Sequence, residues 1–290
     1  MSEQVCKADM GGDGAAGVDT YGYPVETTGN AVLDILEHRS STRAFARDDN
    51  DRPVAVTDEQ RAAILHAASR APSAGAMMMY SIVSIREQAT LDRLADLCDH
   101  QPMIAKAPWA LIFVVDYAKW IDLFEHVGCF ESEFVERTGK APRRAPGLGD
   151  FAIAAQDAVI AAQNAVVAAE ALGLGSCYIG DIVENAEEVA ELLDLPPYTM
   201  PLSMLIIGTP RKERSAIAHP VVNLVHEEHY RRADDATMDA QVAEMDAMFR
   251  PHAREVGERV VDIYTRKHTS PFMAEMSCSM EWWFKNWLGK

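Results

Sequence analysis

The sequence lacks paired cysteines, an excess of basic residues and long apolar runs. Its five cysteines are odd in number and never in C-x-x-C spacing, which argues against a disulfide framework or a thiolate metal cage. Only 27 Lys and Arg stand against 44 Asp and Glu, and the net charge of −17 disfavours nucleic-acid and membrane partners. The longest uninterrupted apolar run, residues 110–115, is far shorter than the ~20 residues that cross a bilayer.

The N-terminal segment also lacks apolar periodicity. It is polar, Gly-rich and acidic, without the basic and apolar regions of a secretory signal, so residues 1–28 are expected to form a mobile leader. The scattered cysteines favour a reducing cytoplasm. The 290 residues are 48% hydrophobic and 24% charged, an ordinary globular composition with room for a large core.

Short β-rich runs alternate with helical spacing along the rest of the chain. Strands are predicted over residues 80–85, 109–115, 176–179 and 202–208, never as adjacent hairpins. The strongest helix, residues 150–172, would be roughly 35 Å long, and its Ala- and Val-rich face allows close approach of another backbone. A sheet covered by helices is therefore expected, in an α/β or α+β fold.

Two segments have residues suited to ligand binding. Arg39, Ser40, Ser41 and Arg43 place two guanidiniums and two hydroxyls at a helix end, where they can surround one phosphate. A solvated basic turn has the same pattern. Residues 72–76 join a helix to a strand, and their amides and small side chains can line a flat ligand or form an ordinary turn.

More specific motifs are absent. Gly173-Leu174-Gly175 does not continue into G-x-G-x-x-G, and there is no Walker A sequence or G-x-S-x-G. His226 and His229 are three residues apart, whereas zincins need four. The sequence therefore predicts neither a metal site nor a catalytic acid, base or nucleophile.

Taken together, and in their order along the chain, the two ligand-binding segments, the long helix and the strands resemble the FMN-dependent nitroreductase family of NAD(P)H oxidoreductases. Residues 39–45 resemble its R-x-S-x-R/K-x-F signature, which grips the FMN phosphate. Residues 71–75 resemble its second flavin loop, and residues 154–181 resemble its long helix and third flavin loop. Residues 201–210 resemble a strand that ends in a G-x-P turn, and the resemblance covers about residues 29–232.

The resemblance implies an α+β sandwich whose central, mainly antiparallel sheet is flanked by helices. It implies an interlocked homodimer with two FMN sites at the subunit interface. Residues 29–232 would form the FMN-binding domain, and residues 233–290 a helical extension. The tryptophan-rich end of this extension either reaches over the partner or packs as an amphipathic helix within its own chain.

The same resemblance assigns the cofactor contacts. FMN-binding residues are expected at Arg39, Ser40, Ser41, Arg43, Pro72, Ser73, Ala74, Ala76, Met78, Tyr178, Ile179, Gly180, Asp181 and Arg214. Residues 77–80 and 139–149 are expected to shape the acceptor pocket.

Three positions depart from the family pattern. Ala76 replaces an Asn, which removes one side-chain hydrogen bond to the flavin, a loss of about 1 kcal/mol. Asp181 stands where Gly is frequent, and its charge would disfavour an anionic hydroquinone if it pointed inward. Ala218 replaces a basic residue that touches the phosphate, so Arg211, Lys212 or, as we predict, Arg214 takes that role.

The activity implied is ping-pong hydride transfer. FMN would accept hydride at N5 from NADH or NADPH and pass it to a small acceptor, such as a nitroaromatic, a quinone or a flavin. An alternative is a flavin-binding module without nicotinamide turnover, used for storage, sensing or by a partner. Reductive dehalogenation, flavin fragmentation and a structural protein without flavin remain further alternatives.

Overall fold

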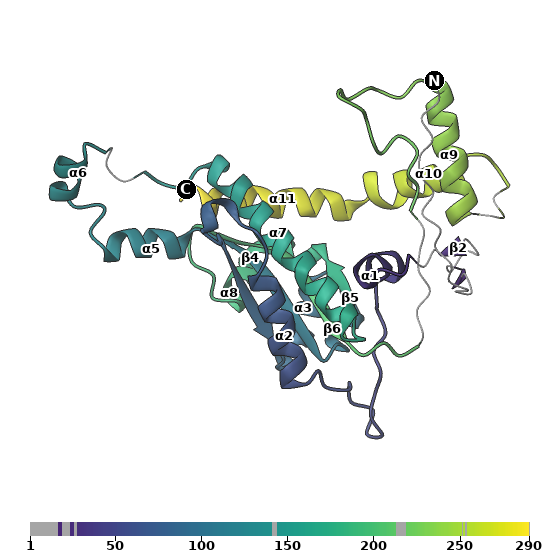
Figure 1. Cartoon of the computed structure of the whole chain (residues 1–290), viewed down its shortest axis with the longest axis horizontal. Coiled ribbons are helices and arrows are strands. Elements are labelled where there is room, and N and C mark those ends of the chain that lie inside the picture. Colours follow the sequence, from purple (N-terminus) through teal and green to yellow (C-terminus); the bar gives the residue numbers. More distant parts are fainter. Residues whose placement is uncertain are drawn as a thin grey trace.

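Among the described residues, a four-stranded antiparallel sheet forms the centre of the molecule (Figure 1). The structure is a computed structural model and describes residues 17–18, 24–25, 28–140, 144–212, 219–250, 252 and 254–289. In spatial order the strands are β3 (Tyr80–Ile85), β4 (Trp109–Asp116), β6 (Thr199–Gly208) and β5 (Gly175–Ile179). Every neighbouring pair is antiparallel, which confirms the predicted sheet and the α+β class.

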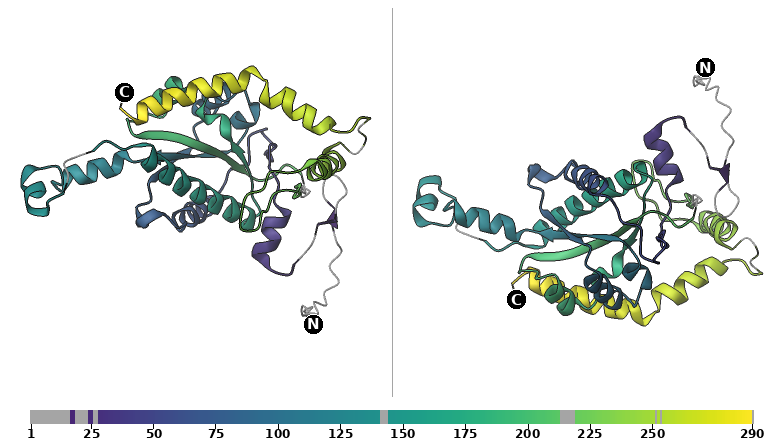
Figure 2. Two further views of the ribbon diagram at one scale, coloured as in Figure 1. Left: turned by 90° about the horizontal axis from the view of Figure 1, so that it is seen from above. Right: turned by 90° about the horizontal axis from the view of Figure 1, so that it is seen from below.

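β4 is an interior strand that is buried on both faces of the sheet. Its side chains alternate, so Trp109 and Phe113 join the core on one face, while Ala110 and Ile112 join the core on the other. A strand covered on both faces needs a continuous apolar run, which explains the composition of residues 109–115. Figure 2 shows a helical layer on each side of the sheet.

The helical layers contain elements from distant parts of the chain. One layer consists of α2 (Asp58–Ser69) and α7 (Leu148–Ala171). The other contains α3 (Gln88–Leu97), α4 (Pro102–Ala105), α8 (Ala186–Leu192) and α11 (Pro271–Trp287). Shorter or peripheral elements are β1 (Gly17–Val18), β2 (Pro24–Val25), α1 (Ala31–His38) and the 3-10 turns η1 (Ala74–Ala76) and η2 (Gly180–Val183).

α7 is the long helix predicted over residues 150–172. Its buried alanines, among them Ala158, Ala161 and Ala165, let it approach α2 and the sheet closely. By length and composition alone it is apolar enough to cross a membrane. One of its faces is buried against the sheet, so α7 is the core helix of its layer.

Two short helices project from the body of the molecule (Figure 1). They are α5 (Ala118–His126) and α6 (Ser132–Thr138). Gly128, with φ +73°, lies between them and turns the chain in a conformation that favours glycine. The chain then returns to the body at the start of α7.

The C-terminal part of the chain, from Asp235 onward, is mainly helical. It comprises α9 (Asp235–Phe249), α10 (Glu258–Ile263), a π-helical turn η3 (Tyr264–His268) and α11. Trp283 and Trp287 of α11 are fully buried, and their indole Nε1 atoms donate to the carbonyl oxygens of Val183 at 2.9 Å and Gly147 at 3.1 Å. Of the two roles expected for the tryptophan-rich end, the structure shows packing on its own chain.

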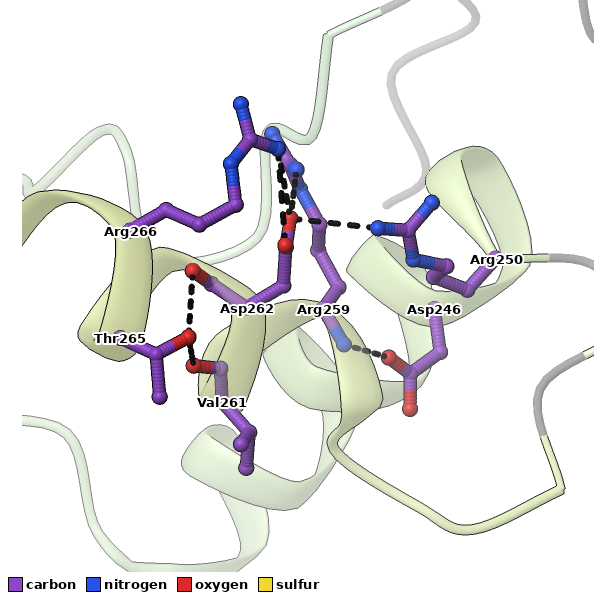
Figure 3. A network of polar contacts seen from close by, with 7 residues as sticks. All are labelled: Asp246, Arg250, Arg259, Val261, Asp262, Thr265 and Arg266. Atoms are coloured by element: carbon purple, nitrogen blue, oxygen red, sulfur yellow. Dashed lines mark hydrogen bonds and ion pairs between the residues drawn. The ribbon is translucent and has the colours of Figure 1, made fainter.

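A charge network joins α9 to α10 (Figure 3). Arg250, Arg259 and Arg266 all approach the Asp262 carboxylate, at 3.3, 2.8 and 3.3 Å. Asp246 accepts the amide of Arg259 at 3.0 Å, which fixes the start of α10 against α9. The network accounts for the sharp turn between the two helices.

Candidate functional site

The segment that follows α1 runs alongside β5, at the edge of the sheet. Ser41 forms a parallel bridge with Ser176, and the Thr42 amide donates to the Ser176 carbonyl oxygen at 2.8 Å. Ser40 and Thr42 are buried, whereas Ser41 is half-buried and Arg43 is exposed. This alternation, typical of extended chain, turns Ser41 and Arg43 outward and Ser40 inward.

Cationic side chains line two adjoining cavities beside this segment. A cavity of about 460 Å³ is lined by Ser41 and Arg43 together with Arg211 and Lys212. A second cavity, about 690 Å³, has Arg39 in its wall and shares Arg211 and Lys212. The larger cavity is also lined by Asp34, Ile35, His38, Glu170, Gly173, Thr209 and Pro210. We call Arg39, Ser41, Arg43, Arg211 and Lys212 the phosphate cradle, because guanidinium, ammonium and hydroxyl donors suit a phosphate dianion.

The third cationic contact predicted from the sequence, Arg214, lies outside the described residues. The two alternatives, Arg211 and Lys212, lie on the wall that both cavities share. The Arg211 amide donates to the carbonyl oxygen of Ala44 at 3.0 Å, which holds this backbone beside the first segment. Both alternatives therefore line the same two cavities as Arg39 and Arg43.

The third predicted flavin segment lies directly against the first. Burial raises the pKa of the Cys177 thiol, while the Arg43 charge, a hydrogen bond with Ser41 and the Arg39 charge oppose that rise. Burial also raises the pKa of Tyr178 to about 12, again against the charge of Arg39. The fold thus brings together two segments that lie about 135 residues apart in the chain.

The remaining residues of the third segment have different surroundings. Ile179 is buried in the core and Gly180 is exposed. The Asp181 carboxylate accepts a hydrogen bond from the side-chain amide of Gln101, next to α4. This hydrogen bond turns the Asp181 charge toward the α3–α4 layer.

The second predicted segment forms a tight turn between α2 and β3. Gly75, Ala76 and Met78 have φ values of +57°, +55° and +49°. The Met78 amide donates to Ser73 Oγ at 3.1 Å, which closes the turn. Left-handed backbone at Ala and Met is strained and persists only where surrounding contacts impose it.

The second segment does not join the other two within one chain. It precedes β3 at one edge of the sheet, whereas Ser41 bridges β5 at the opposite edge, three strands or roughly 14 Å away. It also lies at the Tyr80 end of β3, whereas Ser176 is at the level of the other end, Ile85, roughly 20 Å along the strands. Within one chain, the second segment and the cradle therefore lie at opposite corners of the sheet.

Comparison with known proteins identifies the fold. A model of the nitroreductase family matches residues 36–209, which contain all three segments. The chain belongs to the nitroreductase family. The match also includes α7 and all four strands of the central sheet.

Curated relatives and a solved structure agree with this assignment. The chain is 33% identical to FMN reductase [NAD(P)H] of Bacillus subtilis (strain 168) over 216 residues, 73% of this chain and 79% of that protein. It is 32% identical to oxygen-insensitive NADPH nitroreductase of Salmonella typhimurium over 217 residues, 73% of this chain and 81% of that protein. The structure of B. megaterium NfrA2 superposes with a TM-score of 0.68 at 28% identity, covering 86% of this chain and 97% of that one.

Sequence reasoning missed a residue that supports the second segment of this nitroreductase. Asp157 of α7 is 2% exposed and accepts the amides of Ala74 at 2.9 Å and Met79 at 3.3 Å. The available signal was a lone carboxylate within the Ala- and Val-rich face of α7, where an unpaired charge is unfavourable. Trp120 adds a second contact, because its indole donates to the Met77 carbonyl oxygen at 2.9 Å.

Gly175 is expected to be intolerant of any side chain. A Cβ atom there would lie 2.1 Å from Thr42 Oγ1 and 2.7 Å from Thr42 Cβ, and Thr42 is itself buried. Gly175→Ala should lower the free energy of unfolding by about 1–3 kcal/mol. Urea unfolding measures this, with Gly149→Ala as the control, since Gly149 has open space at that position. Equal stability of the two variants would contradict the packing described.

Proposed function

We propose that this member of the nitroreductase family is an FMN-dependent NAD(P)H oxidoreductase with ping-pong turnover. The phosphate cradle beside Tyr178 is the observation that carries the proposal. FMN held at this site would supply hydride transfer through its N5, between NADH or NADPH and a small acceptor such as a nitroaromatic, a quinone or a flavin. No side chain acts as acid or base in this scheme.

The protein's contribution is binding and orientation. The phosphate cradle binds the FMN phosphate through charge-assisted hydrogen bonds. Residues 178–181 border the flavin ring, where the exposed Gly180 allows close backbone approach. Residues 72–78 line the ring from the other side, and Met78 and residues 139–149 shape the acceptor pocket. Ser40 supports this arrangement from the inner side of its segment.

The functional unit in this proposal is an interlocked homodimer. The phosphate cradle and the second segment lie at opposite corners of one sheet, so a second copy must supply the missing half of each FMN site. The outer face of α7 has exposed Ile153, Val159 and Ile160, and α1 has exposed Val32 and Leu33. An apolar surface of this kind is typical of a subunit interface.

The proposal also includes a role for the C-terminal extension and a location in the cell. α11 anchors the extension on its own chain, and α9 and α10 reach over the partner with exposed Val256, Val261 and Tyr264. The four cysteines among the described residues, Cys98 to Cys278, are free, which suits the reducing cytoplasm. In this proposal the chain has three parts: a leader (residues 1–28), the FMN-binding domain (29–232) and the C-terminal extension (233–290).

Stopped-flow mixing with NADH or NADPH tests the reaction. The FMN-loaded protein should lose its visible absorbance with at least one nucleotide and regain it when a quinone or nitroaromatic is added. Bound FMN that neither nucleotide bleaches would instead indicate a flavin-binding module used for storage, sensing or by a partner. A protein that takes up no FMN would contradict both functions.

Complementation between two inactive variants tests the shared site. Arg39→Ala/Arg43→Ala removes the cradle, and Gly75→Val displaces the second segment because a β-branched residue is strained at φ +57°. A mixed dimer contains one intact site, so random reassociation should restore about one quarter of wild-type NAD(P)H oxidation. Activity that stays at the level of the separate variants would show that each chain builds its own site.

A further inference from the structure

The second segment is strained and is held in place by a clamp of four side chains. Positive φ values at Ala76 and Met78 are unfavourable for residues other than glycine. The clamp consists of Asp157, Ser73, Trp120 and Lys119, which bond to the backbone of residues 74–80. Such strain is characteristic of functional segments whose shape must be preserved.

Asp157 is the only member of this clamp that grips both ends of the turn. Its Oδ1 accepts the amide of Ala74 at 2.9 Å, and its Oδ2 accepts the amide of Met79 at 3.3 Å. One rigid carboxylate on the core helix therefore sets the spacing between the two ends. The strained residues lie between them, so their conformation depends on this spacing.

A buried carboxylate at this position is unfavourable for stability alone. Asp157 is 2% exposed and sits in a helix face of small apolar residues. The nearby cation is Lys119, whose pKa is lowered by burial and raised by Asp116 and Asp157. Its ammonium donates to the Tyr80 carbonyl oxygen at 2.5 Å. Among the described residues, the hydrogen bonds to Asp157 come from the two backbone amides. Apolar packing would stabilise α7 better than a desolvated charge.

We propose that Asp157 is a positioning residue, whose carboxylate fixes residues 74–79 in the strained shape that receives the flavin ring. This inference rests on the proposed function and adds a residue outside the three flavin segments. Asp157 does not touch the flavin; it acts through the amides of Ala74 and Met79. Because the second segment completes the partner's site, Asp157 positions the ring bound to the other chain's cradle.

Asp157→Asn is the variant that tests the clamp with the least change in shape. The amide keeps one acceptor oxygen and presents an NH₂ group to the second backbone amide, so one end of the turn is released. Asn164→Ala is the matched control on the same helix, because it loses a single 3.1 Å hydrogen bond to Ala67 in α2 and leaves the turn intact. Both variants are expected to lose some thermal stability.

Three measurements separate positioning from plain stability. Asp157→Asn should weaken FMN binding about tenfold, equivalent to about 1.4 kcal/mol, and alter the visible circular dichroism of the bound flavin. Amide hydrogen exchange at residues 74–79 should become at least about tenfold faster, measured without FMN. Asn164→Ala should change none of the three.

The outcomes distinguish this inference from the proposed function. Asp157→Asn with wild-type FMN affinity, dichroism and exchange, but lowered thermal stability, would overturn the positioning role. Failure of the wild-type protein to bind FMN would overturn the proposed function and with it the flavin role of Asp157. Hydrogen exchange would still show in that case whether the carboxylate holds the turn.

Discussion

Arg39→Ala/Arg43→Ala is expected to lower FMN affinity by at least about 100-fold. Arg39 and Arg43 each line one of the two cavities, and Arg211 and Lys212 line both. A hydrogen bond to a charged group contributes about 1.5–3 kcal/mol, so losing two corresponds to two or more factors of ten. Titration of FMN with apoprotein, followed by flavin fluorescence, measures the dissociation constant.

A matched control removes two positive charges from a neighbouring surface turn. Arg47→Ala/Arg52→Ala breaks pairs with Asp51 and Asp48 that lie at the surface, outside the cavity walls. This control should retain wild-type FMN affinity, since exposed pairs contribute little and general charge effects are screened by salt. Equal weakening by both double variants would assign the effect to net charge, and unchanged affinity in Arg39→Ala/Arg43→Ala would place the phosphate elsewhere.

Glu184→Gln is expected to stabilise the protein at pH 8 and leave its stability unchanged near pH 5. Glu184 is 4% exposed, at the end of η2 where α11 packs. Burial, with the charges of Asp181, Glu275 and Asp99, raises the pKa of this carboxyl to about 7, against one hydrogen bond from the Asp99 amide. Within the described part of the chain its Oε1 has no hydrogen-bond partner.

Proton linkage determines how the stability of the protein changes with pH. The folded-state pKa of Glu184 lies above the value of 4.5 for an ordinary Glu, so the folded state binds more protons between about pH 4.5 and 7. Stability therefore falls as the pH rises through that window, by up to about 3 kcal/mol. Gln resembles the protonated acid and avoids this loss.

Thermal unfolding of the two proteins at pH 5 and pH 8 provides the measurement. The melting temperature of Glu184→Gln should exceed that of the wild type by several degrees at pH 8 and match it at pH 5. Glu191→Gln, an exposed position in α8, makes the same charge change and should shift neither value. A parallel pH dependence in wild type and Glu184→Gln would exclude Glu184 as the group responsible.

The elements that the sequence predicts correctly are those with strong local patterns. The β4 run is continuous because both faces of the strand are buried, and the alanines of α7 recur at helical spacing because one face packs on the sheet. Thr57 and Gln60 form a capping box at the start of α2, a pattern that can be read from the sequence because its two hydrogen bonds are local. The basic segment at Arg39 and Arg43 can likewise be recognised from adjacent residues alone.

Other features depend on contacts between distant residues. Ser40 and Ser41 are neighbours of the same type, yet pairing with β5 buries Ser40 and leaves Ser41 half-buried beside the cavity. Asp181 could have faced the flavin on sequence grounds, but Gln101 holds its carboxylate. The residues next to Ser40, Ser41 and Asp181 in the sequence predict neither the burial of the two serines nor the orientation of the Asp181 carboxylate.

By itself, the sequence determined the family, the strands of the sheet, the core helix and the cationic segment at residues 39–43. Each is encoded by neighbouring residues through hydrophobic periodicity, capping or clustered charge. Only the tertiary structure decided that Asp157 accepts the amides of Ala74 and Met79, that Glu184 is buried among carboxylates and that the second segment lies at the corner of the sheet opposite the cradle. These properties arise from contacts between residues roughly 80 to 135 positions apart, which chain collapse creates and local pattern does not specify.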